Sequence, residues 1–178
     1  DGSKIFFVAA EPRPEDEEKA RKDGDDAIFV DEGPNGQRDG TWTNLWSLDV
    51  GSKEETRLTE EDHRIASFSV SPNGDQVVFT ARTENRRNQQ NQAEIHLLDV
   101  TSGETRQMTD NEAPEGRLTW APDGRRFVYE APSDDQWELR LDKLWIMDAE
   151  SGARRMISEA FDGNIGSFSW TPDGSAIL

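Results

Sequence analysis

The chain has 178 residues, 33% of them hydrophobic, and its 37 acidic side chains against 20 basic ones give a net charge of −17. This acidity argues against nucleic acid and anionic membranes as partners, because both need a basic footprint, and the lack of cysteine excludes disulfides and thiolate metal sites. The charge also predicts a salt-adapted protein, since salt screens self-repulsion; an ordinary acidic surface is the alternative.

The first part of the chain carries an insertion, residues 11–40, between two predicted strands. Pro14 suits the first turn of a helix and Gly24 its end, and acidic and basic residues four positions apart support the helix between them. A strand is then expected at 27–30 and a loop at 33–36. The insertion is either a decorated surface hairpin or a lid near a substrate opening.

A unit of about fifty residues repeats along the chain, marked by a Pro-Asp-Gly or Pro-Asn-Gly turn. Pro72, Pro122 and Pro172 lie 50 residues apart, and a fixed period of this length is typical of repeat folds. A short run with strand chemistry precedes each turn and three more follow it, the second of these ending in aspartate. Four antiparallel strands per repeat, named a to d in chain order, predict a β-propeller blade; a sandwich with regular turns is the alternative.

The repeats predict an all-β protein, a β-propeller fragment of about three four-stranded blades with a short helical insertion in the first. Asp1-Gly2 matches the end of the repeated turn and Leu178 falls inside a strand b, so a piece of a longer protein is expected. Self-association of half-propellers is a separate hypothesis, in which strand a of one chain (167–174) completes the first blade of another and gives a six-bladed ring. The expected boundaries are 1–59 with the insertion 11–40, 67–109, 117–158, and 167–178 as the start of a further blade.

The sequence contains no recognisable catalytic motif: it has no nucleophile elbow, metalloprotease helix, phosphate loop or dinucleotide fingerprint. His96 takes the slot of Trp46 and Trp145 and is expected to pack in a strand, and His63 is expected to be structural or solvated. The aspartates that end strand c are expected to cap the next turn. No calcium-loop spacing appears, and no run approaches the ~20 apolar residues of a membrane span. The sequence therefore indicates no cofactor, no metal site and no membrane span.

Several motifs together resemble known propeller repeats. The Trp-Ser/Thr-Pro-Asp-Gly turn, the Leu-Trp-x-x-Asp strand and the strand d that ends in Leu-Thr or Met-Thr are similar to repeats of Tol-system propellers and of the propeller domain of prolyl oligopeptidase family serine peptidases. Residues 11–32, which lead into 44–46, resemble a segment of bacterial acylaminoacyl- and dipeptidyl-peptidase-like members, as do residues 63–68. Val70 and His96 depart from the family pattern, which has tryptophan at both positions.

In that family a propeller caps a C-terminal α/β-hydrolase domain, admits short peptides and excludes folded proteins. The resemblance implies that the chain is the substrate-gating portion of a serine peptidase that cleaves short peptides, and that peptide substrate is met through a hydrolase domain. The family's Ser, Asp and His triad lies in that domain and matches no position here, so the fragment itself is expected to be non-catalytic. The alternative is a Tol-like, non-enzymatic propeller that binds a protein or peptide partner. The compartment stays open between the cytoplasm of a bacterium and its periplasm or exterior.

Four residues are weak candidates for substrate gating or contact. Trp42 and Trp137 fall outside the tryptophan positions that recur in the repeats, so they are candidates for an exposed contact. Glu17 and Glu18 stand in the predicted helix; dipeptidyl-type relatives hold a substrate's amino terminus with a glutamate pair, but the local motif differs and that role is not carried over. The recurrent tryptophans are expected in the core between blades: Trp46, Trp120, Trp145 and Trp170.

Overall fold

The described part of the chain falls into two compact units. The first is formed by Asp1–Arg64 with Thr83–Gln90, and the second by Ile65–Arg82 with Asn91–Leu178. No helix in the described part is long and apolar enough to cross a membrane. The computed structural model describes these residues: 2–10, 15–24, 42–60, 63–83, 91–111, 113–134 and 136–178.

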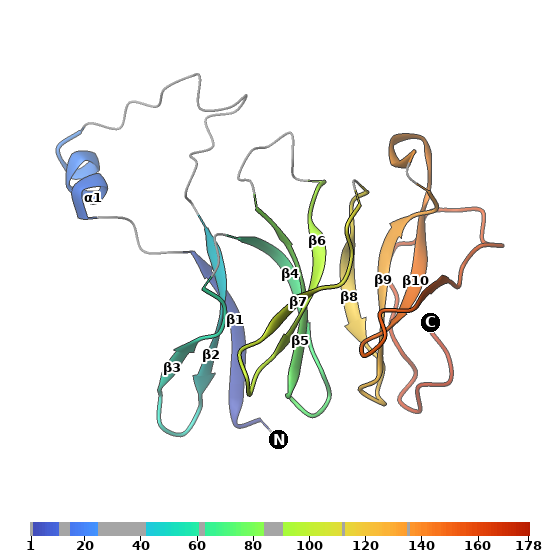
Figure 1. Cartoon of the computed structure of the whole chain (residues 1–178), viewed down its shortest axis with the longest axis horizontal. Helices are drawn as coiled ribbons and strands as arrows, with labels where there is room; N and C mark the ends of the chain where they lie inside the picture. The colour runs from blue at the N-terminus through green and yellow to red at the C-terminus, as the bar shows by residue number, and fades with distance from the viewer. Residues whose placement is uncertain are drawn as a thin grey trace. The chain divides into compact units, whose positions relative to one another are not determined.

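The insertion of the first repeat contains the predicted helix, α1 (Glu15–Lys22) (Figure 1). Seven of its eight residues are charged, so it has no apolar face and draws support from pairs four positions apart, such as Glu18 with Lys22 at 3.1 Å. Gly24, with φ of +84°, follows its last turn, where a residue that tolerates the left-handed region ends a helix. The strand and the loop predicted between 27 and 36 lie outside the described residues.

The first blade is a set of three antiparallel strands in the order β1-β2-β3. Ile5 lies opposite Leu48 and Phe7 opposite Trp46, so these apolar side chains share one face of the blade. Within the first compact unit, a single parallel bridge pairs Thr43 of β2 with Arg64. The strands of the first blade are β1 (Lys4–Ala10), β2 (Thr43–Asp49) and β3 (Glu55–Arg57).

The second compact unit contains two blades of four strands each, as the repeat predicts (Figure 1). The second blade has the order β4-β5-β6-β7 and the third blade the order β8-β9-β10-β11. Their strands are β4 (Arg64–Val70), β5 (Gln76–Arg82), β6 (Glu94–Asp99), β7 (Thr105–Gln107), β8 (Gly116–Trp120), β9 (Arg126–Pro132), β10 (Asp142–Asp148) and β11 (Arg154–Met156).

Strand d ends earlier than the sequence predicts in each blade. The predicted strand ran to Thr59 in the first blade and Thr109 in the second, whereas the observed strands end two residues before these threonines. The threonine hydroxyl takes the place of a backbone acceptor: Thr109 Oγ1 accepts from the backbone amide of Ile95 on strand c at 2.8 Å, and Thr59 does the same for Leu45 at 3.0 Å. The side-chain bond therefore terminates the ladder.

The hairpin turn between strands a and b forms as predicted. In the third blade the backbone amide of Ala121 donates to the carbonyl of Arg126 at 2.8 Å, which closes the Pro-Asp-Gly turn. Gly124 has φ of +66°, and its counterparts Gly74 and Gly174 also have positive φ. A side chain at these three positions would be strained, which explains why the turn repeats glycine.

The turn between strands c and d is capped by the aspartate that ends strand c, as predicted. Asp148 Oδ1 accepts from the hydroxyl of Ser151 at 2.7 Å and from its backbone amide at 2.8 Å. These two bonds hold the pKa of Asp148 below its usual range, because they stabilise the ionised carboxylate. Asp49 and Asp99 cap their own turns with the same pattern of bonds.

In the described part of the chain, the larger core cluster lies between the second and third blades. Trp120 is 6% exposed, meets the ring of Phe127 edge-on at 5.6 Å, and donates from Nε1 to the carbonyl of Ser69 on the second blade at 3.0 Å. His96 is buried and stacks on Phe79 at 5.3 Å, so it packs in its strand as predicted. The two blades contribute these buried side chains to the joint: Val78, Ile95, Leu97, Leu118, Trp120, Phe127, Tyr129, Ala131, Met147 and Ala149.

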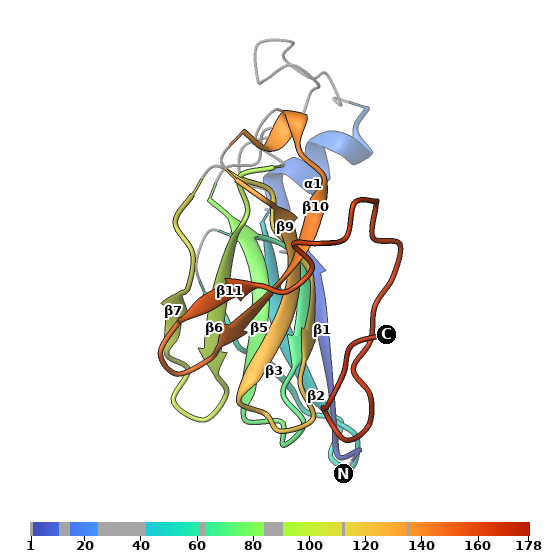
Figure 2. The ribbon, with the colours of Figure 1, turned by 90° about the vertical axis from the view of Figure 1, so that its right-hand side faces the viewer.

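The last repeat differs from its prediction. Strands were expected at 167–170 and 176–178, but the structure has only one isolated bridge there, between Trp170 and Ile177. A hairpin of this length is not stable by itself, and no strand c of the same repeat is present in the described chain to pair with it. The segment, red in Figure 2, still lies beside the third blade. Phe168 and Trp170 pack against Ile146 and its neighbours.

Candidate functional site

The four predicted contact residues fall in different parts of the fold. Glu18 lies in α1 with its side chain 57% exposed and paired with Lys22, and the side chain of Glu17 lies outside the described part. Trp42 is half-buried just before β2, and Trp137 is half-buried at the start of a short 3-10 helix. Glu18 and Trp42 belong to the first compact unit and Trp137 to the second. The described contacts of these residues do not connect them, and contact with a substrate stays a prediction for each.

The connection between β9 and β10 has an apolar tip. Asp134 pairs with Arg140 at 2.7 Å and so braces the turn that carries Trp137. Beyond it, Leu139 is 80% exposed and Leu141 is 38% exposed. This connection joins strand b to strand c, at the end of the third blade opposite its Pro-Asp-Gly turn (Figure 1). It offers apolar groups to a ligand or a neighbouring domain.

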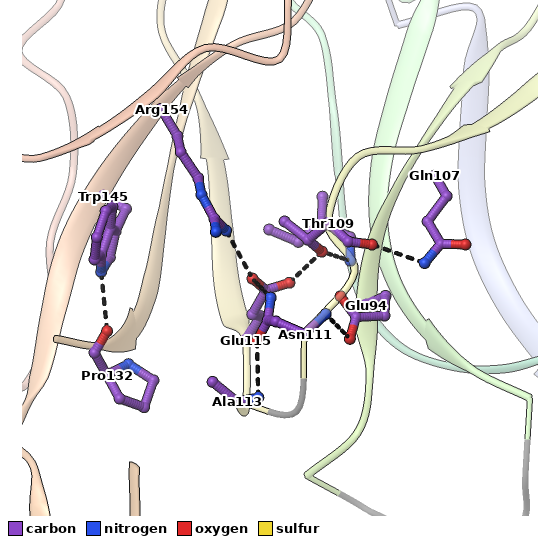
Figure 3. Close-up of polar contacts among 10 residues, drawn as sticks. Glu94, Gln107, Thr109, Asn111, Ala113, Glu115, Pro132, Trp145 and Arg154 are labelled. Atoms are coloured by element: carbon purple, nitrogen blue, oxygen red, sulfur yellow. Dashed lines mark hydrogen bonds and ion pairs between the residues drawn. The ribbon is translucent and has the colours of Figure 1, made fainter. Parts of the chain in front are cut away.

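A buried carboxyl, that of Glu115, occupies the joint between the second and third blades (Figure 3). Glu115 lies just before β8, and its side chain is 1% exposed. Its Oε2 accepts a hydrogen bond from Thr109 Oγ1 at 2.5 Å, and its Oε1 accepts one from Asn111 Nδ2 at 3.0 Å. The guanidinium of Arg154 on β11 lies 3.8 Å from Oε1 and 5.8 Å from the centre of the Trp145 ring. We call Glu115, Thr109, Asn111, Arg154 and Glu94 together the acid cluster.

Glu115 occupies a position that other repeats fill with isoleucine. Ile65 lies 50 residues before it and Ile165 lies 50 residues after it. Ile65 is 5% exposed, so the backbone at this position directs the side chain inward whatever its chemistry. The chain next to Glu115 is also irregular: Arg117 has φ of +49°, and the register of β8 against β9 shifts at this point. Such a bulge re-aims the side chains beside it.

The acid cluster has unusual titration behaviour. Burial raises the pKa of Glu115 to about 7, against the two hydrogen bonds that it accepts, which favour the ionised form. The carboxylate of Glu94 raises this pKa further, and Arg154 lowers it. Burial also raises the pKa of Tyr129 to about 12, with Glu115 adding to the effect and Arg154 opposing it. Glu115 therefore changes its protonation near neutral pH, whereas Tyr129 keeps its proton.

Backbone and hydroxyl groups hold the acid cluster in place. The backbone amide of Asn111 donates to Glu94 Oε1 at 2.9 Å, and Glu94 Oε2 is buried without a hydrogen-bond partner in the described part. Thr109 Oγ1 accepts from the amide of Ile95 while it donates to Glu115. The arrangement can hold or release one proton inside a joint between blades. Among the described residues, no group of three or more His, Cys, Asp or Glu side chains is placed to bind a metal ion.

The sequence analysis did not single out Glu115. The available signal was the replacement of isoleucine by glutamate at one of three equivalent positions. That signal becomes meaningful only with the partners. Thr109 is a repeat feature, but the other two are not: Asn111 lies in an irregular link, and Arg154 stands where the second blade has Thr105. Their convergence on one carboxyl is a property of the folded joint.

Solved propeller proteins match the chain. TolB from Acinetobacter baumannii is 19% identical, with 76% of this chain and 31% of that chain covered and a TM-score of 0.57. The β-propeller domain of the Trilobed protease from Pyrococcus furiosus is 14% identical over 97% of this chain and 44% of that chain, with a TM-score of 0.59. An oligogalacturonate lyase in complex with manganese is 15% identical over 98% and 43%, with a TM-score of 0.68. Prolyl endopeptidase, Pyrococcus horikoshii acylaminoacyl peptidase and tricorn protease structures also match.

These similarities establish the architecture. No family model and no curated protein matches the chain. The chain spans less than half the length of each of these solved structures. Tol proteins, peptidases and a lyase share the architecture, so the fold does not distinguish their activities. The propellers of Tol and peptidase proteins are among the matches, as the sequence motifs implied, and the chain is an all-β protein built from the four-stranded blades of a β-propeller.

Proposed function

We propose that the chain is the substrate-gating propeller portion of a serine peptidase that cleaves short peptides, and that it supplies no catalytic group itself. The supporting observation is the place where the peptidase-like segment enters the fold. Residues 11–46 run from the end of β1 into β2, so the segment includes the whole connection between strands b and c of the first blade. A long connection at this place can narrow an entrance without disturbing the strands below it.

The equivalent connection of the third blade indicates what such a rim offers a peptide. Trp137 is half-buried, and Leu139 and Leu141 present apolar surface. Contacts of this kind accept many side chains, which suits a gate that selects by size more than by sequence. The second and third blades are held together by hydrogen bonds such as that from Trp120 Nε1 to the carbonyl of Ser69. The strands next to this connection are therefore fixed in place.

The test compares the polypeptide that the gene encodes with the 178-residue chain alone. A fluorophosphonate probe reacts with activated serine hydroxyls. It should label the whole polypeptide at a serine outside residues 1–178 and leave the isolated chain unlabelled. The whole polypeptide should cleave a short peptide and spare the same sequence within a folded protein. A labelled serine inside 1–178, or a whole polypeptide without serine hydrolase activity, would overturn the proposal.

The gating role has its own test. Deletion of residues 11–40 should increase cleavage of a long unfolded polypeptide relative to a short peptide, because the deletion widens the entrance. Glu104→Gln, in the turn between strands c and d of the second blade, is the control and should leave the ratio unchanged. If the deletion leaves the ratio unchanged while the peptidase stays active, the chain belongs to a peptidase but does not gate it.

The second candidate is a Tol-like propeller that binds a protein or peptide partner without catalysis. The observation in its favour is the match to TolB from Acinetobacter baumannii over 76% of this chain. The coding region that follows Leu178 separates the candidates. Further repeats and then a Gly-x-Ser-x-Gly elbow would support the peptidase, and repeats followed by a stop codon would support the binding protein.

A further inference from the structure

The third blade differs from the second at two repeat positions that carry opposite charges. At the inward position before strand a, the second blade has Ile65 and the third has Glu115. At the first residue of strand d, the second blade has Thr105 and the third has Arg154. An isoleucine thus occurs with a threonine, and a buried carboxyl occurs with a guanidinium. This joint change of two positions indicates that the acid and the base act on each other.

The strand register places Arg154 on the face of the third blade that meets the second blade. Arg154 lies opposite Met147 where β11 pairs with β10, and Met147 is fully buried in the core between these two blades. Side chains that lie opposite each other in a ladder share one face of the sheet. Trp145, two residues away on β10, packs against the same core. The guanidinium of Arg154 therefore reaches into the joint from the last strand of its blade.

Glu115 is fixed in the joint by bonds that do not involve Arg154. Its two carboxyl oxygens accept from Thr109 and Asn111, and its side chain is 1% exposed. The Arg154 side chain is 46% exposed, and its Nη1 lies 3.8 Å from Glu115 Oε1, beyond the distance of about 2.7–3.2 Å that a hydrogen bond needs. Arg154 is therefore the partner that can move, because part of its side chain already meets water.

Trp145 gives Arg154 a second partner. Trp145 Nε1 donates to the carbonyl of Pro132 at 3.2 Å, which holds the ring in place. A guanidinium above an aromatic ring is attracted to its face, and this attraction does not depend on the charge of Glu115. Arg154 lies between the two partners, with its guanidinium 5.8 Å from the centre of the Trp145 ring (Figure 3). Only one of these two partners can change its charge.

The ionisable groups that face Glu115 within the described chain come from three strands. Glu94 on β6 raises the pKa of Glu115, whereas Arg154 on β11 lowers it. Tyr129 on β9 keeps its proton, since burial raises its own pKa to about 12. With both glutamates ionised, two carboxylates and one guanidinium give the acid cluster a net charge of −1. One proton makes the cluster neutral, and Glu115 takes it because burial raises its pKa to about 7.

We propose that Glu115 and Arg154 form a pH-sensitive latch in the joint between the second and third blades. When Glu115 is ionised, Arg154 closes onto its Oε1 and ties β11 to the link between the blades. When Glu115 takes up a proton from solvent, this attraction is lost and Arg154 stays on the Trp145 ring. The hydroxyl of Thr109 serves both states, because it donates to a carboxylate and accepts from a protonated carboxyl. The latch is independent of the proposed function.

A double-mutant cycle with Glu115→Gln and Arg154→Met, measured by urea unfolding, tests the latch. At pH 8.5, Arg154→Met should lower the folding equilibrium constant by roughly fivefold, because it removes the partner of a buried carboxylate. At pH 5, and at both pH values in the Glu115→Gln background, the loss should be about twofold or less. Arg155→Met is the matched control, because Arg155 is the next residue of β11 and the described residues give it no hydrogen-bond or ion-pair partner. Its effect should not depend on pH.

Nuclear magnetic resonance of the unmutated chain follows the two side chains directly. The carboxyl carbon of Glu115 and the Nε–H group of Arg154 should change their chemical shifts with one common midpoint between pH 5 and 8.5. The signals are assigned by their loss in Glu115→Gln and Arg154→Met. Glu94→Gln keeps an oxygen for the backbone amide of Asn111 and removes a negative charge, so it should lower the midpoint.

Two results would overturn the latch. An equal loss for Arg154→Met at both pH values, or in both backgrounds, would show that Arg154 stabilises the joint only through the Trp145 ring and its own methylene stem. An Arg154 signal that does not follow the Glu115 carboxyl would show that the arginine does not respond to the proton. Arg154→Lys separates the charge from the shape of the guanidinium: it should regain part of the stability that Arg154→Met loses at pH 8.5 and add nothing at pH 5.

Discussion

Two joints in the second compact unit have the same backbone arrangement but differ in the chemistry of their side chains. The first lies between the second and third blades, and the second lies between the third blade and residues 158–178. In each joint a hydroxyl after strand d, on Thr109 or on Ser158, accepts from a backbone amide of strand c at 2.8 Å. At the inward position before strand a, the first joint has Glu115 and the second has Ile165.

The two joints also differ in the residue at the start of strand c. The first joint has Glu94, whose carboxyl joins the acid cluster, and the second has Lys143, whose Nζ donates to the carbonyl of Phe161. The repeat fixes the backbone and its hydroxyl bond, and two positions then decide whether the joint contains the acid cluster or an isoleucine and a lysine. The first joint is closed by side chains of two blades, whereas in the described chain only residues 158–178 pack on the second, so the comparison can be tested through packing and through charge.

The largest expected effect concerns packing, and one matched pair of tryptophans measures it. Trp120 is 6% exposed in the first joint, and Trp170, at the same repeat position, is half-buried in the second. Trp120→Ala should lower the free energy of unfolding by roughly 3–5 kcal/mol, because it empties a covered core. Trp170→Ala should cost only about 1–2 kcal/mol, since much of that side chain already meets water. Urea unfolding at concentrations where the chain is monomeric gives both values, and equal losses would show that the second joint is covered.

The next effect concerns the proton of Glu115. The pKa of this carboxyl is raised from 4.5 to about 7 in the folded chain, so the folded state keeps a proton between these pH values that the unfolded chain has released. This contribution to stability is fully present below pH 4.5 and is lost as the pH rises to about 7. Its size is roughly 3 kcal/mol. Glu115→Gln mimics the protonated form, so it should stabilise the chain by about that amount at pH 8 and leave it unchanged near pH 4.5.

Urea unfolding of both proteins across this pH range checks the prediction, with the difference between them as the readout. The difference removes the carboxylates that do not interact with Glu115, because their contribution is the same in both proteins. Glu18→Gln is the control, because Glu18 is exposed on α1, and its difference from the wild type should not vary over this range. A difference for Glu115→Gln that is also independent of pH would mean that folding does not shift the pKa of Glu115.

The blade pattern was predictable because it depends on local chemistry that recurs. Proline with Asp-Gly fixes one turn, an aspartate such as Asp148 caps the other, and the runs between them alternate in the strand period. The ends of strand d were placed too late, because the hydroxyl of Thr109 replaces a ladder bond and its sequence still has strand character. Residues 167–170 were expected to form a strand, but a strand needs neighbours that the described chain does not supply.

The acid cluster was not predictable to the same degree. Glu115 could be flagged from the sequence as an exception to the isoleucine of Ile65 and Ile165. Thr109 recurs with the repeat, but the other partners come from a link and from β11 of the same blade, at distances in sequence that follow no period. A raised pKa depends on burial and on those partners together, and neither can be read from a local pattern. The weak contact candidates of α1 and of the tryptophans outside the repeat stay predictions for the same reason.

A smaller effect concerns the arginines that reach toward the next blade. Arg106→Met should lower the free energy of unfolding by about 1 kcal/mol, because it removes two hydrogen bonds to the carbonyls of Ala149 and Glu150 at the rim of the first joint. Arg155→Met changes the equivalent position of the second joint, where the described chain offers no acceptor, and should leave monomer stability unchanged. Urea unfolding of the two variants at low concentration decides the matter. Equal losses would mean that the arginine acts through its methylene stem and not through its hydrogen bonds.

The smallest expected effect is that of salt on the melting temperature, and it distinguishes the exposed carboxylates from the buried Glu115. The net charge of −17 predicts that the melting temperature rises with KCl, because salt screens repulsion between exposed carboxylates. Glu115 is shielded from solvent, so salt should act on it weakly and the pH dependence that it causes should persist in high KCl. Wild type and Glu115→Gln should therefore gain the same number of degrees between low and molar KCl, measured by thermal melts at pH 8. A wild-type melting temperature that does not change with KCl would contradict salt adaptation, and a larger gain for the wild type would show that Glu115 is repelled mainly by the surface charge around it.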